Sequence, residues 1–191
     1  MIQHPGYCVV PRVLGAAEIE KVLQALRSYT DSTRLLLNQP YFATLAADLP
    51  GRIPAVENLT PVLATYFYKS SGHNWGVAPH QDLQVPVADN NVGTWRNPTI
   101  KEGVPFIQAP ESVLQDCVNV RLQLDALSEG DLTLQQGDEN KAVSLVPGDA
   151  LIFSPLAVHS SAKLSGDNKM RRTVQILYGP ERLPAPYAWY S

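Results

Sequence analysis

The chain has 191 residues, of which 45% are hydrophobic and 17% are charged, and its formal net charge is −3. This length and composition suit one globular domain and exclude wholesale disorder. The small negative charge gives no general attraction to nucleic acid or anionic membranes, and no apolar run approaches the roughly 20 residues that span a bilayer. The first residues lack the basic and apolar segments of a signal peptide, so we expect a cytoplasmic protein with neither kind of partner.

The first third of the sequence predicts a short strand and two helices. Residues 7–13 have the composition of a strand, and Pro11 favours an edge because proline lacks a backbone N–H donor. Apolar side chains at helical spacing predict a helix over residues 16–29. These side chains are Ile19, Val22, Leu23 and Leu26. A weaker helical pattern covers residues 41–49 and ends before Pro50.

The rest of the chain predicts short strands separated by turns. They are expected over residues 62–69, 118–125, 132–134, 143–146, 150–153, 157–160 and 171–179. Residues 118–125 alternate apolar with polar side chains, which is the period of a half-buried strand, and residues 137–140 predict a polar turn. Because the strands do not alternate with long helices, the pattern indicates a sandwich or barrel rather than a doubly wound parallel sheet.

Residues 86–112 fit neither pattern. The segment contains Trp95 and four prolines among many polar side chains. A segment of this length without predicted elements is usually a lid or a binding loop in a compact domain. The alternative is a surface excursion that covers an exposed sheet edge.

Two of the four histidines lie in patterns that suit a metal ion. His80 and Asp82 are two residues apart, so their side chains share one face of an extended backbone. His159 lies near the end of a later predicted strand. Two imidazoles and one carboxylate form the facial set that holds iron(II) and leaves positions open for a cosubstrate and O2. The alternatives are a chance triplet at His80 and a buried, hydrogen-bonded structural histidine at His159.

Arg171 and Arg172 open the last predicted strand. A guanidinium that points into a barrel needs an anionic partner, and its planar fork suits a carboxylate. Thr173 faces the same way as Arg171 and offers a hydroxyl donor. The alternative is that both arginines are surface charges on an edge strand.

Several of these residues belong to a series of short motifs between Tyr66 and the C-terminus. The motifs are WGVAPHQD at 75–82, KEGVP at 101–105, RLQLDAL at 121–127, PGDA at 147–150, HSS at 159–161 and RRTV at 171–174. In this order they resemble the phytanoyl-CoA dioxygenase-like family, within the iron(II)- and 2-oxoglutarate-dependent oxygenases. The order of several motifs is far more specific than any one of them.

The resemblance implies a mainly β fold, a double-stranded β-helix (a jelly roll, cupin-like) with N-terminal helices packed on one sheet. Residues 1–191 would form one oxygenase domain. Its N-terminal strand and helices would occupy residues 1–60, and its β-helix core residues 61–191, with residues 86–112 as a lid-like insertion. The implied reaction hydroxylates an unactivated C–H bond of a small-molecule metabolite and releases succinate and CO2.

The resemblance also implies the cofactors, which are Fe(II), 2-oxoglutarate as cosubstrate, and O2. His80, Asp82 and His159 would hold the iron and carry the catalysis. The distal carboxylate of 2-oxoglutarate would pair with Arg171 or with Arg172, because strand alternation lets only one of them point inward. We favour Arg171, since the stem of Arg172 would then share the packed face with Val174 and Ile176. The other residues expected to line the cosubstrate pocket are Thr173, Ser161 and Gln81.

Candidate contacts for the substrate are Trp95, Arg121, Tyr66 and Phe106. Trp95 either anchors a lid or belongs to the core. Arg121 suits an anionic substrate, and the alternative is an internal ion pair with Asp125 or another acid. No basic cluster marks a site for the diphosphate of coenzyme A, so we expect a small free metabolite.

Two other functions remain open from the sequence. A cupin-type metalloenzyme that does not use 2-oxoglutarate would keep the two histidines and give the inward arginine no task. A non-catalytic jelly-roll binding module would not bring His80, Asp82 and His159 together, or would fill the pocket with side chains.

Overall fold

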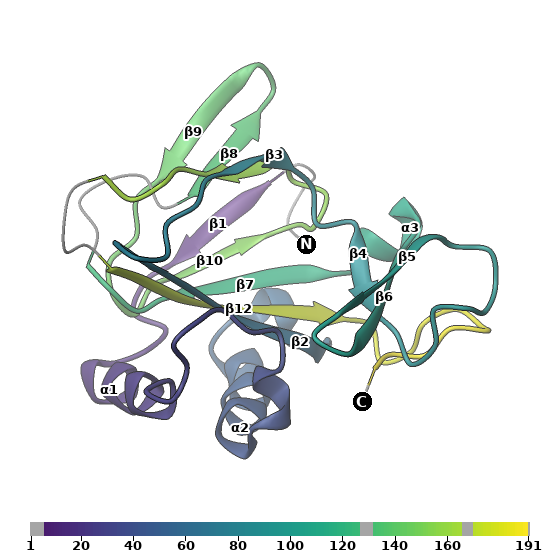
Figure 1. Ribbon diagram of the computed structural model, residues 1–191, viewed down its shortest axis with the longest axis horizontal. Coiled ribbons are helices and arrows are strands. Elements are labelled where there is room, and N and C mark those ends of the chain that lie inside the picture. The colour runs from purple at the N-terminus through teal and green to yellow at the C-terminus, as the bar shows by residue number, and fades with distance from the viewer. Residues whose placement is uncertain (1–5, 127–131, 166–169, 191) are drawn as a thin grey trace.

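The computed structural model describes residues 6–126, 132–165 and 170–190, so Leu127 of the 121–127 motif lies outside the described residues. The strands form three antiparallel sheets, and a five-stranded sheet runs through the middle of the molecule (Figure 1). In spatial order this sheet contains β1 (Tyr7–Val10), β10 (Ala150–Phe153), β7 (Val118–Gln123), β12 (Met170–Gly179) and β2 (Thr60–Ser70).

A four-stranded sheet faces the first one. Its spatial order is β3 (Val77–His80), β11 (His159–Ser161), β8 (Leu132–Gln136) and β9 (Glu139–Val143). Buried side chains of β8 and β9, including Leu134, pack with Leu151 and Phe153 of β10 in one cluster between the sheets. Two antiparallel sheets packed face to face confirm the predicted mainly β, jelly-roll class.

Strand alternation divides the central strands β7 and β12 into an apolar and a polar face. Val120 of β7 and Val174 of β12 pack in the core cluster that contains the helices. The alternate residues face the other sheet, and five of them are polar yet almost fully buried, namely Asn119, Arg121, Gln123, Arg171 and Thr173. The polar side of these strands therefore points into the jelly roll and supplies the chemistry of its interior.

Two helices cover the outer face of the five-stranded sheet, α1 (Ala16–Ala25) and α2 (Pro40–Asp48) (Figure 1). Val22 and Phe42 are buried against the sheet, and full burial of such a side chain stabilises the fold by about 1.5–3 kcal/mol. Helix α1 is shorter than predicted because the Tyr29 N–H bonds to the Leu26 carbonyl, three residues back, which tightens the chain out of the α-helix.

Short helical turns connect the larger elements. They are η1 (Leu36–Asn38), η2 (Leu49–Gly51), η3 (Pro54–Val56) and α3 (Glu111–Leu114). The first three lie between α1 and β2 along the chain, and Leu36, Leu49 and Val56 bury their side chains in the same core cluster as the helices. These helical turns thus extend the layer of helices on the outer face of the sheet.

The predicted loop at residues 86–112 instead forms most of a third sheet. Its strands, in spatial order, are β4 (Gln84–Pro86), β6 (Val104–Gln108) and β5 (Arg96–Lys101). The sheet packs on the C-terminal segment, where Val87 forms a β-bridge with Trp189. The sequence did not predict β5 because its side chains are almost all exposed, which removes the hydrophobic alternation.

The hairpin of β8 and β9 also differs from the prediction. Gln136 and Glu139 are partners across a two-residue turn, so the predicted turn is confirmed at residues 137–138, while Glu139 and Asn140 already belong to β9. Gly137 has a φ of +60°, as such a turn requires. Strand β9 lies at the sheet edge with four of its five residues exposed, so it carries no apolar pattern.

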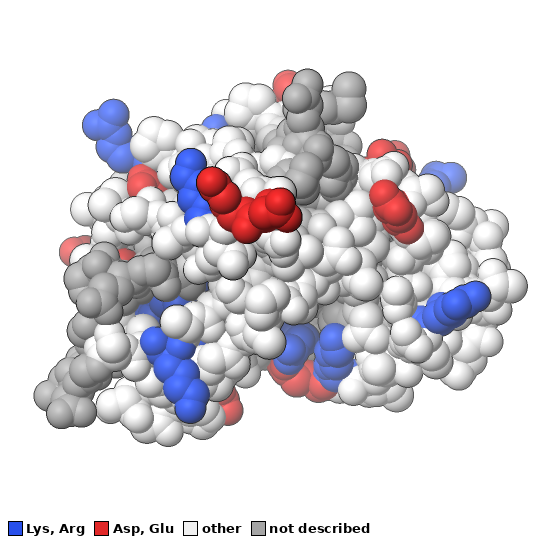
Figure 2. Space-filling model, turned by 90° about the horizontal axis from the view of Figure 1, so that it is seen from above, with Lys and Arg blue, Asp and Glu red and all other residues white. Residues whose placement is uncertain are grey.

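Among the described residues, no helix is long and apolar enough to cross a membrane. On the face seen in Figure 2, lysine and arginine side chains are scattered among acidic and uncharged ones. That face therefore shows no continuous basic surface of the kind that binds nucleic acid.

Candidate metal centre

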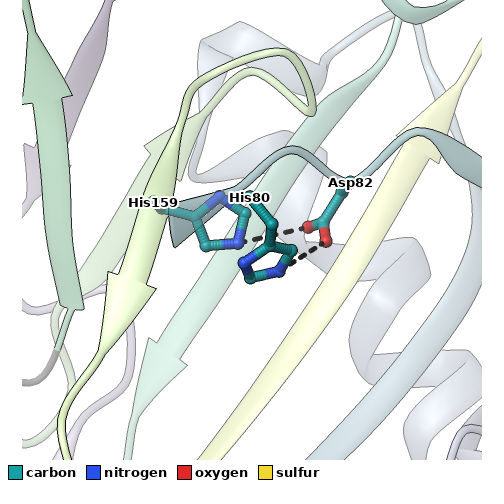
Figure 3. Close-up of side chains that lie close together, drawn as sticks. All are labelled: His80, Asp82 and His159. Atoms are coloured by element: carbon teal, nitrogen blue, oxygen red, sulfur yellow. Dashed lines mark ion pairs between the residues drawn. The ribbon is translucent and has the colours of Figure 1, made fainter. Parts of the chain in front are cut away.

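The structure brings His80, Asp82 and His159 together at one end of the four-stranded sheet (Figure 3). His80 ends β3 and His159 begins β11, and the two are direct partners in the antiparallel pairing of these strands. Their ring centroids lie 4.3 Å apart. Asp82 follows two residues after His80, and its backbone N–H bonds to the Pro155 carbonyl in the connection that leads to His159.

The ligand atoms of the three side chains converge. Asp82 Oδ1 lies 3.6 Å from His80 Nε2, and Asp82 Oδ2 lies 3.8 Å from His159 Nε2. One possible ligand atom from each residue lies within 4.8 Å of the other two. Two imidazole nitrogens and one carboxylate oxygen are a donor set that suits ferrous iron, so the residues fit the metal that the sequence predicted.

Backbone carbonyls fix the orientation of both imidazole rings. His80 Nδ1 lies 2.9 Å from the Ala78 carbonyl, and His159 Nδ1 lies 2.9 Å from the Ala157 carbonyl. A carbonyl can only accept, so each Nδ1 carries a hydrogen and donates it. The lone pair of each neutral ring is then on Nε2, the nitrogen that faces Asp82.

Two amide side chains hold the carboxylate of Asp82. Asn119 Nδ2 and Gln175 Nε2 each donate to Asp82 Oδ2 over 3.1 Å. They come from the polar faces of β7 and β12, which point into the jelly roll. Sequence reasoning missed both residues, although their inward positions on two alternating strands were a usable signal. Because Oδ2 accepts both bonds, the carboxylate is oriented before any ion binds.

Electrostatics prepare the three side chains to act as ligands. Burial alone would raise the pKa of Asp82, but its hydrogen bond to His80 and the nearby His159 lower it, so the carboxylate is ionised. Burial lowers the pKa of His159, although Asp82 opposes this, and the ring is neutral at pH 7. When His80 is protonated, its Nε2–H faces Asp82, and this interaction raises the pKa of the ring. His80 is therefore the ring where protons compete with a metal.

A pocket of about 80 Å³ extends from the three side chains toward β2 and β12. Ser161 lies in it, two residues after His159 on β11 and thus about 7 Å along the same face. Arg171 Nη2 donates to Ser161 Oγ over 2.7 Å, and Lys69 Nζ donates to the same atom over 2.8 Å. Lys69 and Arg171 are partners on adjacent strands, and both side chains are buried. Sequence reasoning missed Lys69, which is the one charged residue of β2.

The two neighbouring arginines point in opposite directions. Arg171 lines the pocket. Arg172 lies on the other face of β12, where its guanidinium binds both carboxylate oxygens of Asp125, with the shortest contact at 2.6 Å. Val174 packs in the core on that same face, as expected from strand alternation. Asp125, expected as a partner of Arg121, is therefore bound by Arg172.

Two residues expected at the cosubstrate pocket lie elsewhere. Gln81 points away from the metal ligands because it lies between them on an extended backbone, and its Nε2 donates to the Leu156 carbonyl over 2.6 Å. It lines a separate cavity beside α3. Thr173 is fully buried on the same strand face as Arg171 but does not line the pocket. Its hydroxyl has no hydrogen-bond partner among the described residues.

The predicted substrate contacts separate into two groups. Arg121 lines the pocket that begins at His80, Asp82 and His159, and its guanidinium lies over the Phe67 ring. Phe106 lines an adjacent cavity that also reaches Asp82. Trp95 instead stacks on Tyr187, with ring centroids 3.8 Å apart, and belongs to the apolar cluster under the third sheet.

Tyr66 does not line the pocket, contrary to the prediction from the sequence. It lies in the core between the five-stranded sheet and the helices, and it is 1% exposed. The next residue along β2, Phe67, lines the pocket in its place. The reason is the two-residue period of a strand, which sends neighbouring side chains to opposite faces.

The fold is shared with several solved structures. HygX from Streptomyces hygroscopicus, solved with iron bound, is 18% identical over 92% of this chain and 82% of its own, with a TM-score of 0.65. The α-ketoglutarate-dependent epimerase SnoN from nogalamycin biosynthesis is 18% identical over 94% of this chain and 80% of its own, with a TM-score of 0.61. EctD from S. alaskensis, in its apoform, is 15% identical over 95% of this chain and 76% of its own, with a TM-score of 0.65.

At 15–18% sequence identity, these likenesses show a common fold and not a common reaction. No family model matches the chain, and no curated protein matches it.

Proposed function

We propose that this chain is an iron(II)- and 2-oxoglutarate-dependent dioxygenase. It hydroxylates an unactivated C–H bond of a small-molecule metabolite and releases succinate and CO2. One observation carries the proposal. His80, Asp82 and His159 converge at one end of a pocket in which buried Arg171 and Lys69 converge on Ser161, about two strand residues away.

The two ends of this pocket suit the two ends of 2-oxoglutarate. His80, Asp82 and His159 would hold the iron through two nitrogens and one oxygen, which leaves positions for a chelating 2-oxo acid and for O2. The guanidinium of Arg171 offers a planar fork to the distal carboxylate, and Lys69 adds a second cation beside it. Ser161, which accepts from both, would exchange these bonds for one to the carboxylate.

When bound, ferrous iron supplies the oxidising chemistry, in which O2 and 2-oxoglutarate are consumed. The residues of the chain would bind the iron and orient the groups around it. The carbonyls of Ala78 and Ala157 keep both rings in the tautomer that binds a metal. Asn119 and Gln175 hold the carboxylate of Asp82 in place, and the buried side chains of Lys69 and Arg171 line the far end of the pocket.

The motifs at residues 75–82, 159–161 and 171–174 also support membership of the phytanoyl-CoA dioxygenase-like family, which we include in the proposal. The likeness to HygX with iron bound and to the α-ketoglutarate-dependent SnoN agrees with the cofactors proposed for this chain. A cupin-type enzyme does not use 2-oxoglutarate, so it would have no ligand for the two buried cations Lys69 and Arg171. A non-catalytic module would not need two amides oriented on one carboxylate.

Turnover of the cosubstrate tests the proposal. The purified chain is incubated with iron(II), ascorbate, O2 and 2-oxoglutarate, and succinate is measured. We expect slow succinate formation even without substrate, and its loss in His159→Ala and in Arg171→Gln. The matched control is Arg172→Gln, which removes the neighbouring guanidinium and should keep activity. Equal succinate from His159→Ala and the wild type, or none from either, would reject the proposal.

A further inference from the structure

A second cavity lies against the metal centre, on the side of the third sheet. It has a volume of about 120 Å³ and shares Phe67, Asp82 and Gln175 with the pocket that ends at Arg171. Residues of β4, β5 and β6 close its other side. Asp82 therefore lies between two compartments, and only one of them contains the residues assigned above to 2-oxoglutarate.

Lys101, the last residue of β5, supplies a cationic group to this second cavity. Its Nζ lies 4.8 Å from the centre of the Phe106 ring, which also lines the cavity. Burial lowers the pKa of this ammonium and the nearby guanidinium of Arg34 lowers it further, while the Asp82 carboxylate opposes both effects without cancelling them. In the described part of the chain, Lys101 forms no ion pair. A partly desolvated ammonium of this kind is stabilised by an anion that enters beside it.

The turn after Lys101 is tied down, which fixes the place of the ammonium. Glu102 Oε2 accepts from the Thr33 hydroxyl over 2.7 Å and from the Arg34 backbone N–H over 2.9 Å. Glu102 Oε1 accepts from Arg34 Nη1 over 2.9 Å. Arg34 also lines the cavity, but its charge is balanced by this ion pair. Lys101 is then the cation of this wall that remains available for a ligand.

The other walls restrict what fits. Leu63, Phe67 and Leu177 give the cavity an apolar surface next to Asp82. The amide of Gln84 is committed to Asn97 and Thr99. A volume of 120 Å³ corresponds to about four water molecules at the ~30 Å³ that each occupies in the liquid. The cavity thus accepts a short carbon segment near the metal with a charged group at the far end.

We propose that this cavity is the substrate site, and that Lys101 binds an oxyanion, a carboxylate or a phosphate, on a small anionic substrate. The inference rests on the function proposed above, and it adds the chemical class of the substrate. The anion holds one end of the molecule at β5, and the apolar walls direct its C–H bonds toward the side of Asp82 that faces the metal. An uncharged analogue of the same shape leaves the ammonium desolvated without a partner, so it binds more weakly.

The methyl protons of three small probes test the proposal by NMR. The chain is loaded with manganese(II), which does not turn over, and saturated with 2-oxoglutarate so that the first pocket is filled. Acetate, methylphosphonate and uncharged acetamide are then titrated, and the paramagnetic relaxation of their methyl protons is measured. We expect saturable relaxation for acetate or methylphosphonate and much weaker relaxation for acetamide. The anion that binds more tightly, acetate or methylphosphonate, indicates whether the substrate carries a carboxylate or a phosphate.

Lys101→Met keeps an unbranched side chain, one atom shorter than lysine, and removes the charged Nζ that lies over Phe106. We expect it to weaken binding of the preferred anion at least tenfold, and Lys101→Gln to do the same if the first variant is unstable. The control is Lys141→Met, on the exposed strand β9, which should bind the anion as the wild type does. Equal relaxation by acetamide, no saturable relaxation by either anion, or unchanged binding in both Lys101 variants would overturn the proposal.

Manganese and 2-oxoglutarate affinities of each variant are measured first. If the wild type binds neither, the proposed function fails, and the anion site is then judged by the thermal shift that each anion gives to wild type and Lys101→Met. If both bind normally and the anions do not, only the substrate class is overturned.

Discussion

His80 and His159 are direct partners across the antiparallel pairing of β3 and β11. Two ligands far apart in sequence thus become neighbours through backbone hydrogen bonds rather than through a mobile loop. Both rings donate Nδ1–H to a carbonyl two residues earlier, so the same local geometry is used twice. A site built on paired strands holds its ligands within narrow limits, which favours metal binding with little reorganisation.

The amides that hold Asp82 predict a specific loss of metal affinity. Gln175→Met removes one donor to Oδ2 while keeping the side chain's length. Loss of such a supporting bond typically weakens metal binding about 10- to 100-fold. Anaerobic calorimetric titration with manganese(II) measures the change. The matched control is Gln123→Met, a buried inward-facing amide whose Nε2 bonds to the Asp125 carbonyl instead. If both variants lose the same affinity, Asp82 is not held in the way that we describe.

Because Arg171 and Arg172 point in opposite directions, we predict that one variant lowers 2-oxoglutarate affinity and the other lowers stability. Arg171→Gln should weaken 2-oxoglutarate binding about 10- to 100-fold, because hydrogen bonds to a charged group contribute about 1.5–3 kcal/mol. Arg172→Gln should leave that affinity intact and lower the stability, because it leaves Asp125 without its guanidinium. Equilibrium titration with 2-oxoglutarate and chemical denaturation measure the two effects. The reverse result would assign the cosubstrate to Arg172.

Glu102 predicts a pH-dependent contribution to stability. Burial alone would raise the pKa of this carboxyl, but bonds from Arg34 and Thr33 lower it below its ordinary value of 4.5. The folded state therefore favours the ionised form, so the stabilisation is complete above that value and is lost as pH falls through the lower, folded-state pKa. Glu102→Gln should destabilise the chain by about 1 kcal/mol at pH 7, since the pair is partly exposed.

Urea denaturation of both proteins between pH 7 and pH 3 measures this dependence. The difference in free energy of unfolding should be constant near neutrality and shrink in acid. If the difference in free energy of unfolding is as large at pH 3 as at pH 7, the charge of Glu102 does not contribute to stability.

Gly148 predicts a severe loss of stability on substitution. Its φ is +93°, its N–H bonds to the Gln123 carbonyl, and its carbonyl accepts from the Leu14 N–H. A Cβ at this position would collide with the Leu14 carbonyl oxygen. Gly148→Ala should therefore cost at least about 2 kcal/mol. Gly51→Ala is the control, because a Cβ there meets nothing within 4 Å. Equal melting temperatures for the two variants would contradict this account of the turn.

Strand periodicity explains what could be predicted from the sequence. The spacing of His80 and Asp82 predicts a shared face, and the structure places both side chains at one centre with His159. Alternation also predicted that Arg171 faces inward and that Arg172 shares the opposite face with Val174. The structure shows Arg171 in the pocket and Val174 in the core. The mainly β fold is confirmed. Metal and cosubstrate binding by these residues stay predictions.

The remaining features depend on pairing between strands, which one strand's pattern does not contain. Asn119 and Gln175 reach Asp82 only because β7 and β12 are neighbours with their polar faces inside. Lys69 becomes important because its register places it opposite Arg171. Strand β9 carries almost no apolar signal because it lies at an edge, so hydrophobic periodicity could not find it.

Anaerobic titration of the chain with iron(II) in the presence of 2-oxoglutarate tests the central claim most directly. A 2-oxo acid that chelates ferrous iron gives a charge-transfer band in the visible spectrum. We predict that this band saturates at one iron per chain in the wild type and is absent in His159→Ala. A wild type that shows no band, or a His159→Ala variant that shows the same band with the same affinity, would contradict the account.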